Sequence, residues 1–313
     1  MDMKEVLALG AELRNWGRWG AEDQIGTLNF ITPAKVIEAG GLVRAGKSFS
    51  LCIPFDSKGP QSGGGRFNPL YFTRADGGDD AIGAQDRIPG GARFQDDFVV
   101  MPLQTATQWD SLSHCWYDGQ LYNGVPSTTV SSTGARKNGI EHTKDRFVTR
   151  GVLLDIARSK GRDWLEPGYP ITVADLEACA GEEGVTIGSG DALLVRTGHQ
   201  AMCRSQGSWG TYAGGDAPGL AIETARWLHS HEVCAVATDT WGMEVRPNEP
   251  DNAFQPLHMV LIRDMGMSVG EIFYLDQLAE DCATDRVWEF MFVAPSLPFT
   301  GAAGSPVNPI AVK

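Results

Sequence analysis

MPLQTATQWDSLSHCWYDGQLYNG, residues 101–124, is the most informative stretch of the sequence. It carries Gln104, Gln108, Asp110 and His114 at even offsets from one another. Successive side chains of a β-strand alternate between its two faces, so an extended segment points all four in one direction. An α-helix would instead place the two glutamines nearly opposite Asp110 and His114. We therefore predict a strand whose polar face converges on one site, although an Asp and a His at this spacing can also form an ordinary hydrogen-bonded pair.

Strand and helix patterns alternate along the rest of the chain. Apolar runs predict strands at residues 47–54, 150–156, 191–197, 234–238 and 287–293. Helices are predicted at 33–39, which Pro33 opens, at 173–184, which Thr172 can cap, at 218–231, and at 254–265, which Gly266 ends. This alternation is typical of a mixed α/β architecture, and we predict a single domain spanning residues 1–313.

Three segments lack such a pattern. Residues 15–29 predict an ordered loop within an N-terminal loop or helix arm that covers residues 1–45. Residues 59–91 are rich in Gly, Asp and Arg and predict a mobile loop or an oligomer contact. The tail from Pro295 is expected to pack along the surface or to reach a neighbouring subunit.

The charge balance excludes several classes of partner. The 313 residues include 39 acidic and 26 basic side chains, which give a formal net charge of −13. Such a surface repels nucleic-acid phosphates and anionic membranes, so neither is an expected partner. No stretch has the roughly 20 apolar residues that span a bilayer or the apolar run of a signal peptide, and we expect a cytoplasmic protein. The six cysteines form no C-x-x-C pair, which predicts reduced thiols.

Segment 104–114 resembles the motif His-x-Gly-Thr-His-x-Asp-x-Pro-x-His of the cyclase family of metal-dependent hydrolases, which includes bacterial kynurenine formamidases and isatin hydrolases. Asp110 and His114 match the Asp and the last His of that motif. Gln104 and Gln108 stand where its first two His occur, so the chain resembles a divergent branch of the family. Thr107 matches the Thr, whereas the Gly and the Pro are replaced by Ala106 and Leu112.

The order of later segments is also similar to that family. GVLLDIA begins at residue 151, GDALLVRTG at 190 and VATDTW at 236, and His258 and Glu271 follow. The resemblance implies an α/β fold, a single mixed domain with a barrel-like central β-sheet flanked by helices. It also implies assembly as a homodimer or homotetramer.

The resemblance further implies a metal site. In relatives that bind two metals, the residues that resemble Asp110, His114, His258 and Glu271 hold one ion, while the two His that are glutamine here help to hold the other. One divalent ion is therefore expected, with the second site impaired. Asp, His and Glu side chains suit zinc or manganese. Taken alone, His258 and Glu271 could equally be structural.

Further candidate residues accompany this set. Asp239 ends an apolar strand, where open sheets place functional groups, but it could equally cap the following turn. Gln104 and Gln108 are candidates for orienting a substrate. Cys115 is not expected to act as a nucleophile with His114, because neighbouring side chains in a strand point apart. A substrate pocket could be lined by aromatic residues that could equally pack in the core, among them Trp16, Trp109 and Tyr122.

The leading hypothesis is a hydrolase that opens a cyclic amide or lactone, or cleaves an N-acyl group, in a small organic molecule. Water activated by the metal would be the nucleophile, and His114 would be either a ligand or the general base. One alternative is a metal-free hydrolase in which Gln104 and Gln108 donate hydrogen bonds to an oxyanion while His114, steered by Asp110, activates water. Another is a non-catalytic protein that binds a small molecule.

Overall fold

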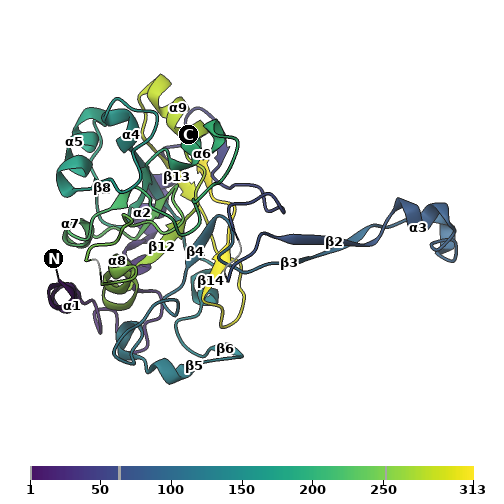
Figure 1. Ribbon diagram of the computed structural model, residues 1–313, viewed down its shortest axis with the longest axis horizontal. Helices are drawn as coiled ribbons and strands as arrows, with labels where there is room; N and C mark the ends of the chain where they lie inside the picture. Colours follow the sequence, from purple (N-terminus) through teal and green to yellow (C-terminus); the bar gives the residue numbers. More distant parts are fainter. Residues whose placement is uncertain (1, 63–64, 251) are drawn as a thin grey trace.

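The computed structural model describes residues 2–62, 65–250 and 252–313, and a nine-stranded sheet organises it (Figure 1). The sheet curls into a half-barrel with helices against it, which confirms the predicted mixed α/β domain with a barrel-like central sheet. In spatial order its strands are β1 (Ser48–Ser50), β15 (Ile310–Val312), β13 (Glu289–Val293), β7 (Val148–Asp155), β9 (Ala192–Arg196), β11 (Ala235–Thr238), β12 (Ser268–Glu271), β4 (Gln108–Asp110) and β14 (Gly304–Pro306).

Helices and smaller ladders complete the described structure. The helices are α1 (Met3–Glu12), α2 (Pro33–Gly40), α3 (Gly77–Ala81), α4 (Ile156–Ser159), α5 (Val173–Glu183), α6 (His199–Ser205), α7 (Thr224–Ser230), α8 (Pro256–His258), the π-helix η6 (Met259–Met265) and α9 (Asp276–Asp285). Two-stranded ladders pair β2 (Leu70–Ala75) with β3 (Asp96–Val100), β5 (Val130–Ser131) with β6 (Gly134–Ala135), and β8 (Pro170–Ile171) with β10 (Gly219–Leu220).

Alternate residues of the central strands face two separate hydrophobic cores. Strands β7, β9, β11 and β12 run parallel to one another. Leu154 of β7 and Val195 of β9 pack in one core, whereas Leu153 and Leu194 pack in the other. Because helices cover both faces, the central residues of β7, β9 and β11 are apolar on both sides, as in buried parallel strands. This is why their sequences read as continuous apolar runs.

Local signals placed several helices correctly. The Thr172 hydroxyl accepts a hydrogen bond from the backbone N–H of Asp175, and the Asp175 carboxylate accepts one from the N–H of Thr172, which forms a capping box at the start of α5. Pro33 opens α2. The helical prediction for residues 254–265 is confirmed by α8 and η6, and Gly266 ends them in a left-handed conformation.

Two element predictions are wrong because tertiary pairing overrides local pattern. The helix predicted at 218–231 begins only at Thr224, because Gly219 and Leu220 pair with β8 instead. The tail beyond Pro295 does not lie on the surface, since β14 and β15 are strands of the main sheet and Ala311 is fully buried. Among the described helices, none has the length and apolar character needed to cross a membrane.

The segment predicted as a loop, residues 59–91, contributes instead to a long β-hairpin arm that projects from the body (Figure 1). In this arm β2 pairs antiparallel with β3, and α3 lies near the tip. The strands escaped prediction because apolar residues occupy both faces, as in the run Leu70, Tyr71 and Phe72, so the sequence does not alternate. Gly63 and Gly64, within the predicted loop, lie outside the described residues.

Candidate functional site

Two neighbouring strands and one short helix bring together three side chains that could hold a metal ion. Strand β4 pairs antiparallel with β12, and Gln108 lies opposite Glu271. Asp110 is two residues further along β4, so its side chain shares the face of Gln108. His258 ends α8. The ligand atoms of Asp110, His258 and Glu271 all lie within 4.8 Å of one another, and all three residues are buried.

Hydrogen bonds join the residues of this cluster but leave two of its buried side-chain oxygens unpaired among the described residues. His258 Nε2 lies 3.1 Å from Glu271 Oε1 and 3.9 Å from Asp110 Oδ2. Gln108 Nε2 donates to Glu271 Oε2 at 2.7 Å and to Asp110 Oδ1 at 3.4 Å. Asp110 Oδ2 and Gln108 Oε1 are buried and have no hydrogen-bond partner in the described part of the chain. Unpaired buried oxygens are costly, so these two are available to a ligand.

Glu244 orients His258, and the sequence analysis missed it. Its Oε1 lies 2.6 Å from His258 Nδ1 and accepts the backbone N–H of His258 at 2.9 Å. Its Oε2 accepts the N–H of Leu257 at 3.0 Å. A carboxylate behind a histidine fixes the ring and leaves the other nitrogen facing the site. The only signal in the sequence is an isolated Glu between Met243 and Val245, which are both buried.

Left-handed backbone conformations flank the cluster. The φ angles of Met243, Gln255 and Ile272 are 58°, 50° and 60°. A β-branched residue such as Ile272, which directly follows Glu271, rarely adopts this conformation. Each such residue costs on the order of 1–3 kcal/mol and persists only where its surroundings fix it, often at functional sites. Ile272 is fully buried, and its N–H donates to the carbonyl of Thr240 at 2.9 Å.

An open cleft of about 820 Å³ reaches the cluster. His114 and His258 both line it, together with the aromatic rings of Trp116, Trp241 and Phe254. His114 Nε2 lies 3.7 Å from Asp110 Oδ1, which is longer than a hydrogen bond but close enough for both to contact one small ligand. His114 therefore stands where the cluster meets the cleft.

Cys115 also borders the cleft beside His114, and it packs partly against the hydrophobic core. Strand β4 ends at Asp110 and the chain turns at residues 112–114, so strand alternation does not describe this pair, but no hydrogen bond joins the two side chains in the described structure. Burial raises the pKa of the Cys115 thiol to about 12, and the charges of Glu244 and Asp110 act in the same direction. The thiol is therefore protonated at neutral pH and is a poor nucleophile.

Burial and neighbouring charges determine how the site titrates. Burial raises the pKa of Asp110, and the charge of Glu271 adds to the effect. Burial lowers the pKa of His114 to about 3, with the charges of His258 and Arg66 acting in the same direction. For His258 burial opposes the charged form, but hydrogen bonds to Glu244 and Glu271 outweigh it and raise the pKa to about 10. His114 is thus a neutral imidazole at neutral pH.

The donor set fits a divalent metal ion. Two carboxylates and one imidazole nitrogen supply the oxygen and nitrogen ligands that zinc and manganese accept. Asp110 Oδ2 faces the cluster without a hydrogen bond from the described residues, and the Glu244 carboxylate holds His258 as metal-bound histidines are held. The buried group of Asp110, His258 and Glu271 could therefore bind a metal.

Comparisons with known proteins agree with this geometry. A family model named Cyclase, with the description "Putative cyclase", matches residues 49–245, which is more than half of the chain. The chain belongs to the Cyclase family. A search of curated proteins found no match.

Solved structures extend this cyclase assignment to nearly the whole fold. A crystal structure described as a novel cyclase is 41% identical, with 96% of this chain and 99% of that chain covered and a TM-score of 0.88. An isatin hydrolase bound to the product analogue thioisatinate is 17% identical over 89% of this chain and 94% of its own, with a TM-score of 0.60. Isatin hydrolase A from Ralstonia solanacearum is 18% identical over 90% and 97%, also with a TM-score of 0.60. The two isatin hydrolases share the fold.

Gln108 and Asp110 share a face, as predicted, and His114 approaches Asp110. Gln104 lies outside β4, but its amide nitrogen lies beside Gly304 of β14, the residue that pairs with Asp110. Within the described residues no hydrogen bond joins the Gln104 side chain to the other three. The strand was predicted too long because turns occupy residues 103–104 and 112–113.

Three aromatic residues that were predicted to line a substrate pocket pack elsewhere. Trp109 is fully buried, stacks on Phe147 with ring centroids 4.4 Å apart, and donates to a backbone carbonyl. Tyr122 is also fully buried, and its hydroxyl donates to Asp23 at 2.9 Å. Trp16 donates to the carbonyl of Arg263 and packs against the core. None of the three lines the cleft, so their predicted substrate contacts are corrected to packing roles.

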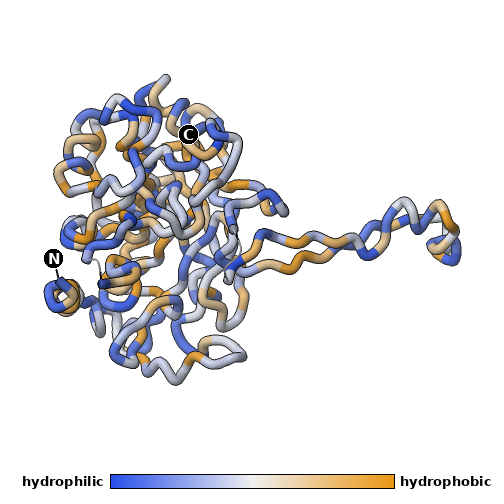
Figure 2. Tube along the Cα trace, viewed as in Figure 1, coloured by the Kyte–Doolittle hydropathy of each residue, from blue (hydrophilic) through white to orange (hydrophobic). Residues whose placement is uncertain are grey.

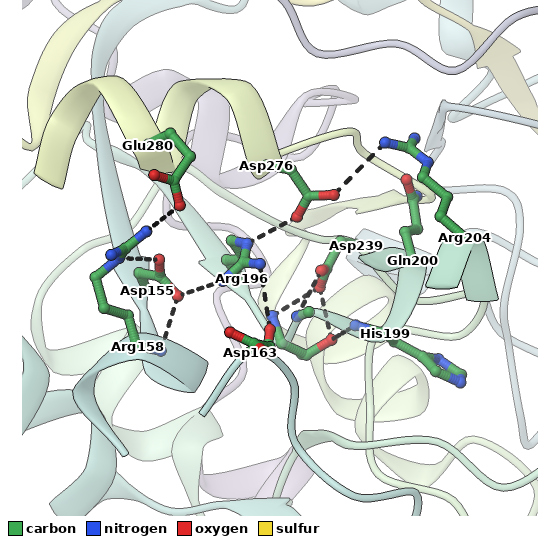
Figure 3. Close-up of polar contacts among 12 residues, drawn as sticks. Asp155, Arg158, Asp163, Arg196, His199, Gln200, Arg204, Asp239, Asp276 and Glu280 are labelled. Atoms are coloured by element: carbon green, nitrogen blue, oxygen red, sulfur yellow. Dashed lines mark hydrogen bonds and ion pairs between the residues drawn. The ribbon is translucent and has the colours of Figure 1, made fainter. Parts of the chain in front are cut away.

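Asp239 belongs neither to the metal-ligand cluster nor to the lining of the cleft, and Figure 3 shows it beside Arg196 and His199. Its Oδ1 accepts hydrogen bonds from the N–H and the hydroxyl of Thr197, and its Oδ2 accepts the N–H of Gly198. These three bonds hold the turn between β9 and α6. Both oxygens are occupied, so the predicted catalytic role is corrected to the capping role that the sequence had left open.

Proposed function

We propose that this protein is a metal-dependent hydrolase that cleaves a cyclic amide, a lactone or an N-acyl bond in a small organic molecule. The observation that carries the proposal is the buried group of Asp110, His258 and Glu271 beside an open cleft of about 820 Å³. Membership of the Cyclase family supports the proposal. A second support is an isatin hydrolase of the same fold that was solved with a product analogue bound.

Each side chain has a defined part in the proposal. Asp110, His258 and Glu271 would hold the ion, and Glu244 would keep His258 Nε2 directed at it. A bound zinc or manganese ion would polarise the scissile carbonyl and lower the pKa of water to about 7. His114, at the mouth of the cluster, would complete the coordination or take the proton from the attacking water.

We propose one ion per chain, because glutamine amides are weak, neutral ligands. Gln108 Nε2 donates to both carboxylates of the cluster, and the side chain of Gln104 packs against Gly304. The same contacts argue against the metal-free alternative, in which both amides would donate to an oxyanion. The Gln108 amide is fully buried and already engaged, so it has no donor to offer a substrate.

Hydrolysis assays with added and removed metal test the proposal. A panel of isatin, dihydrocoumarin and N-formylaniline samples a cyclic amide, a lactone and an N-acyl bond. We expect turnover of at least one class that stops with a chelator and returns with zinc or manganese. Replacing His258 by alanine should lower kcat/KM at least about a hundredfold, as loss of a metal ligand does.

His229→Ala provides the control, because His229 lies on α7 and does not line the cleft. The variant should keep the wild-type rate. Turnover that survives both chelation and His258→Ala would contradict a metal-dependent reaction at this site.

We also propose that the partner of this chain is a second copy of itself, bound through the hairpin arm. Figure 2 shows apolar residues along the arm, which projects beyond the body. The exposed large apolar residues of the arm are Leu70, Tyr71, Phe72, Ile82, Phe94, Phe98, Val99 and Val100. Together they expose on the order of 800 Å². That is about the area each subunit buries in a stable dimer and more than a monomer usually leaves exposed.

The body offers an apolar surface that could receive a partner's arm. Tyr71 and Val99, at the root of the arm, border a groove of about 400 Å³ together with Met101, Leu297 and Val307. A surface that carries both an apolar arm and an apolar groove is complementary to its own copy, which is the requirement for a two-fold symmetric dimer.

A further inference from the structure

Two arginines lie against Trp241 in the wall of the cleft. The guanidinium carbon of Arg66 is 5.2 Å from the centroid of the Trp241 ring, and that of Arg246 is 5.8 Å from it. Arg246 also lies 5.4 Å from the centroid of Phe254. Arg66, Trp241 and Phe254 all line the cleft that His114 and His258 border. Two positive charges are therefore held beside the candidate catalytic groups.

No carboxylate of the described residues neutralises either arginine. The described residues place no carboxylate within ion-pair distance of Arg66 or Arg246, whereas buried arginines elsewhere are paired, as Arg150 is with Asp191 at 2.6 Å. Among the residues that the structure describes, Arg66 Nη1 donates to the carbonyl of Gln104 alone, at 3.2 Å. Arg246 Nη1 is buried and has no acceptor among the described residues. In a chain with a net charge of −13, two unpaired guanidinium groups on one ring are unusual.

The aromatic rings contact the two guanidinium groups but do not provide acceptors for their N–H donors. A cation over an exposed aromatic face gains less than a charged donor gains from a charge-assisted hydrogen bond, so the ring contacts do not replace an anionic partner. A guanidinium group presents several N–H donors in a planar fork that matches a carboxylate. Arg66 lines the cleft, and Arg246, which is not itself a lining residue, contacts the Trp241 and Phe254 rings that are, so an anionic group bound in the cleft would lie near both charges.

The rest of the cleft wall suits an apolar body. Trp116 and Phe254 line it, and their exposed fractions are 43% and 64%, which leaves large ring surfaces for contact. A ligand with a carboxylate on a hydrocarbon ring would place its charge at the arginines and its ring against these aromatic surfaces. The Coulomb attraction would also draw such an anion into the cleft of an acidic protein.

We propose that Arg66 and Arg246 form an anion subsite that selects substrates carrying a carboxylate on an apolar ring, in addition to the bond that is hydrolysed. The inference rests on the proposed function for the role of the cleft as the substrate site. It adds the substrate class, which is an organic anion, and two specificity-determining residues outside the metal cluster.

Binding of a matched pair of probes tests this subsite without any need for turnover. Phenylacetate and phenylacetamide have nearly the same shape and differ in charge, so their affinity ratio reports the subsite. Calorimetric titrations would use the protein as purified and after chelator treatment, since a metal ion also attracts carboxylates. The titrations measure binding and not activity. A negative result would therefore refute the anion subsite without refuting the proposed hydrolysis, and a protein without hydrolase activity could still show the subsite.

We expect phenylacetate to bind wild-type protein about tenfold more tightly than phenylacetamide, with or without chelation, which corresponds to about 1.4 kcal/mol. Arg66→Ala and Arg246→Ala should each reduce this ratio to less than about threefold, and the lysine variants should restore part of it because they keep the charge. Thermal unfolding would establish that each variant is folded. Arg44→Ala is the control, since Arg44 is exposed and does not line the cleft.

Several outcomes would overturn the subsite. They are equal affinities for the two probes, binding of neither probe at millimolar concentration, a preference that disappears on chelation, or a preference that survives in both alanine variants. The last two results would assign the charge selectivity to the metal cluster or to other groups.

Discussion

Glu244 does not border the cleft, yet the geometry makes the site depend on it. Its carboxylate contacts His258 Nδ1 at 2.6 Å and caps two backbone N–H groups at the start of α8. At the scale of single residues, a carboxylate behind a ligand histidine commonly changes metal affinity by about 10–100-fold. The position of one imidazole nitrogen therefore depends on a residue that the ligand motif does not include.

We expect Glu244→Gln to weaken metal binding about 10–100-fold while the protein stays folded, because an amide keeps the shape but loses the charge that makes His258 a stronger ligand. A competition titration with a zinc indicator measures the change. Glu249→Gln, an exposed carboxylate nearby in the sequence, is the matched control. Unchanged affinity in Glu244→Gln would show that His258 is not a ligand or needs no support.

At the scale of elements, the C-terminal end of α5 carries a buried carboxyl group with a shifted pKa. Glu183 Oε2 is buried and has no hydrogen-bond partner in the described chain, while Oε1 accepts the N–H of Asp155. Burial raises the pKa of Glu183 from 4.5 to about 8. The folded protein therefore holds this proton more tightly than the unfolded chain does between these two pH values, and stability is lost as pH rises through that window.

Glu183→Gln should remove this pH dependence, because the amide resembles the protonated acid. We expect the variant to match the wild type near pH 4.5 and to exceed its free energy of unfolding by roughly 1–3 kcal/mol at pH 8.5, a value reduced for partial exposure to solvent. Urea unfolding at the two pH values measures the difference, with Glu182→Gln, an exposed neighbour, as control. A constant difference between wild type and Glu183→Gln across pH would refute the assignment.

The elements also show what the sequence could predict. The start of α5 follows from Thr172 and Asp175, which contact each other within one turn, and the parallel strands follow from their apolar runs. Strand β4 is only three residues long, and its register depends on β12 and β14, which lie far away in the sequence. Alternation alone therefore accounts for Gln108 and Asp110, whereas Gln104 lies outside the strand and comes beside Gly304, the partner of Asp110, through a turn.

The same distinction applies to the site. Asp110, His258 and Glu271 could be named from a family resemblance because they are chemically distinctive and well ordered along the chain. Trp109 and Tyr122 were misplaced because an aromatic residue has the same sequence signal in a core as in a pocket, and only packing separates the two. Glu244 was missed because its role depends on a contact with a residue 14 positions away.

At the scale of the whole molecule, the arm is the feature that a single copy leaves uncovered. An isolated two-stranded hairpin is marginally stable in water, and Phe72 and Phe98 stack across its strands with centroids 5.1 Å apart while remaining half exposed. The double variant Phe72→Asp with Phe98→Asp should convert a dimer or larger assembly to a monomer, because charges would enter the apolar contact. Light scattering after gel filtration measures the mass.

Ile37→Asp is the control, since Ile37 is 77% exposed on α2, away from the arm. It should leave the assembly intact. A wild-type monomer at micromolar concentration, or an unchanged assembly in the double variant, would contradict pairing through the arm.

The central claim is that Asp110, His258 and Glu271 bind a metal ion, and elemental analysis of the purified, tag-free protein tests it most directly. We predict about one zinc or manganese ion per chain, lost in Asp110→Asn and in His258→Ala and kept in Gln104→Ala, because an amide is a weak, neutral ligand and the Gln104 side chain makes no hydrogen bond to the cluster within the described residues. No metal in the wild type after reconstitution, or an unchanged content in Asp110→Asn, would contradict the account.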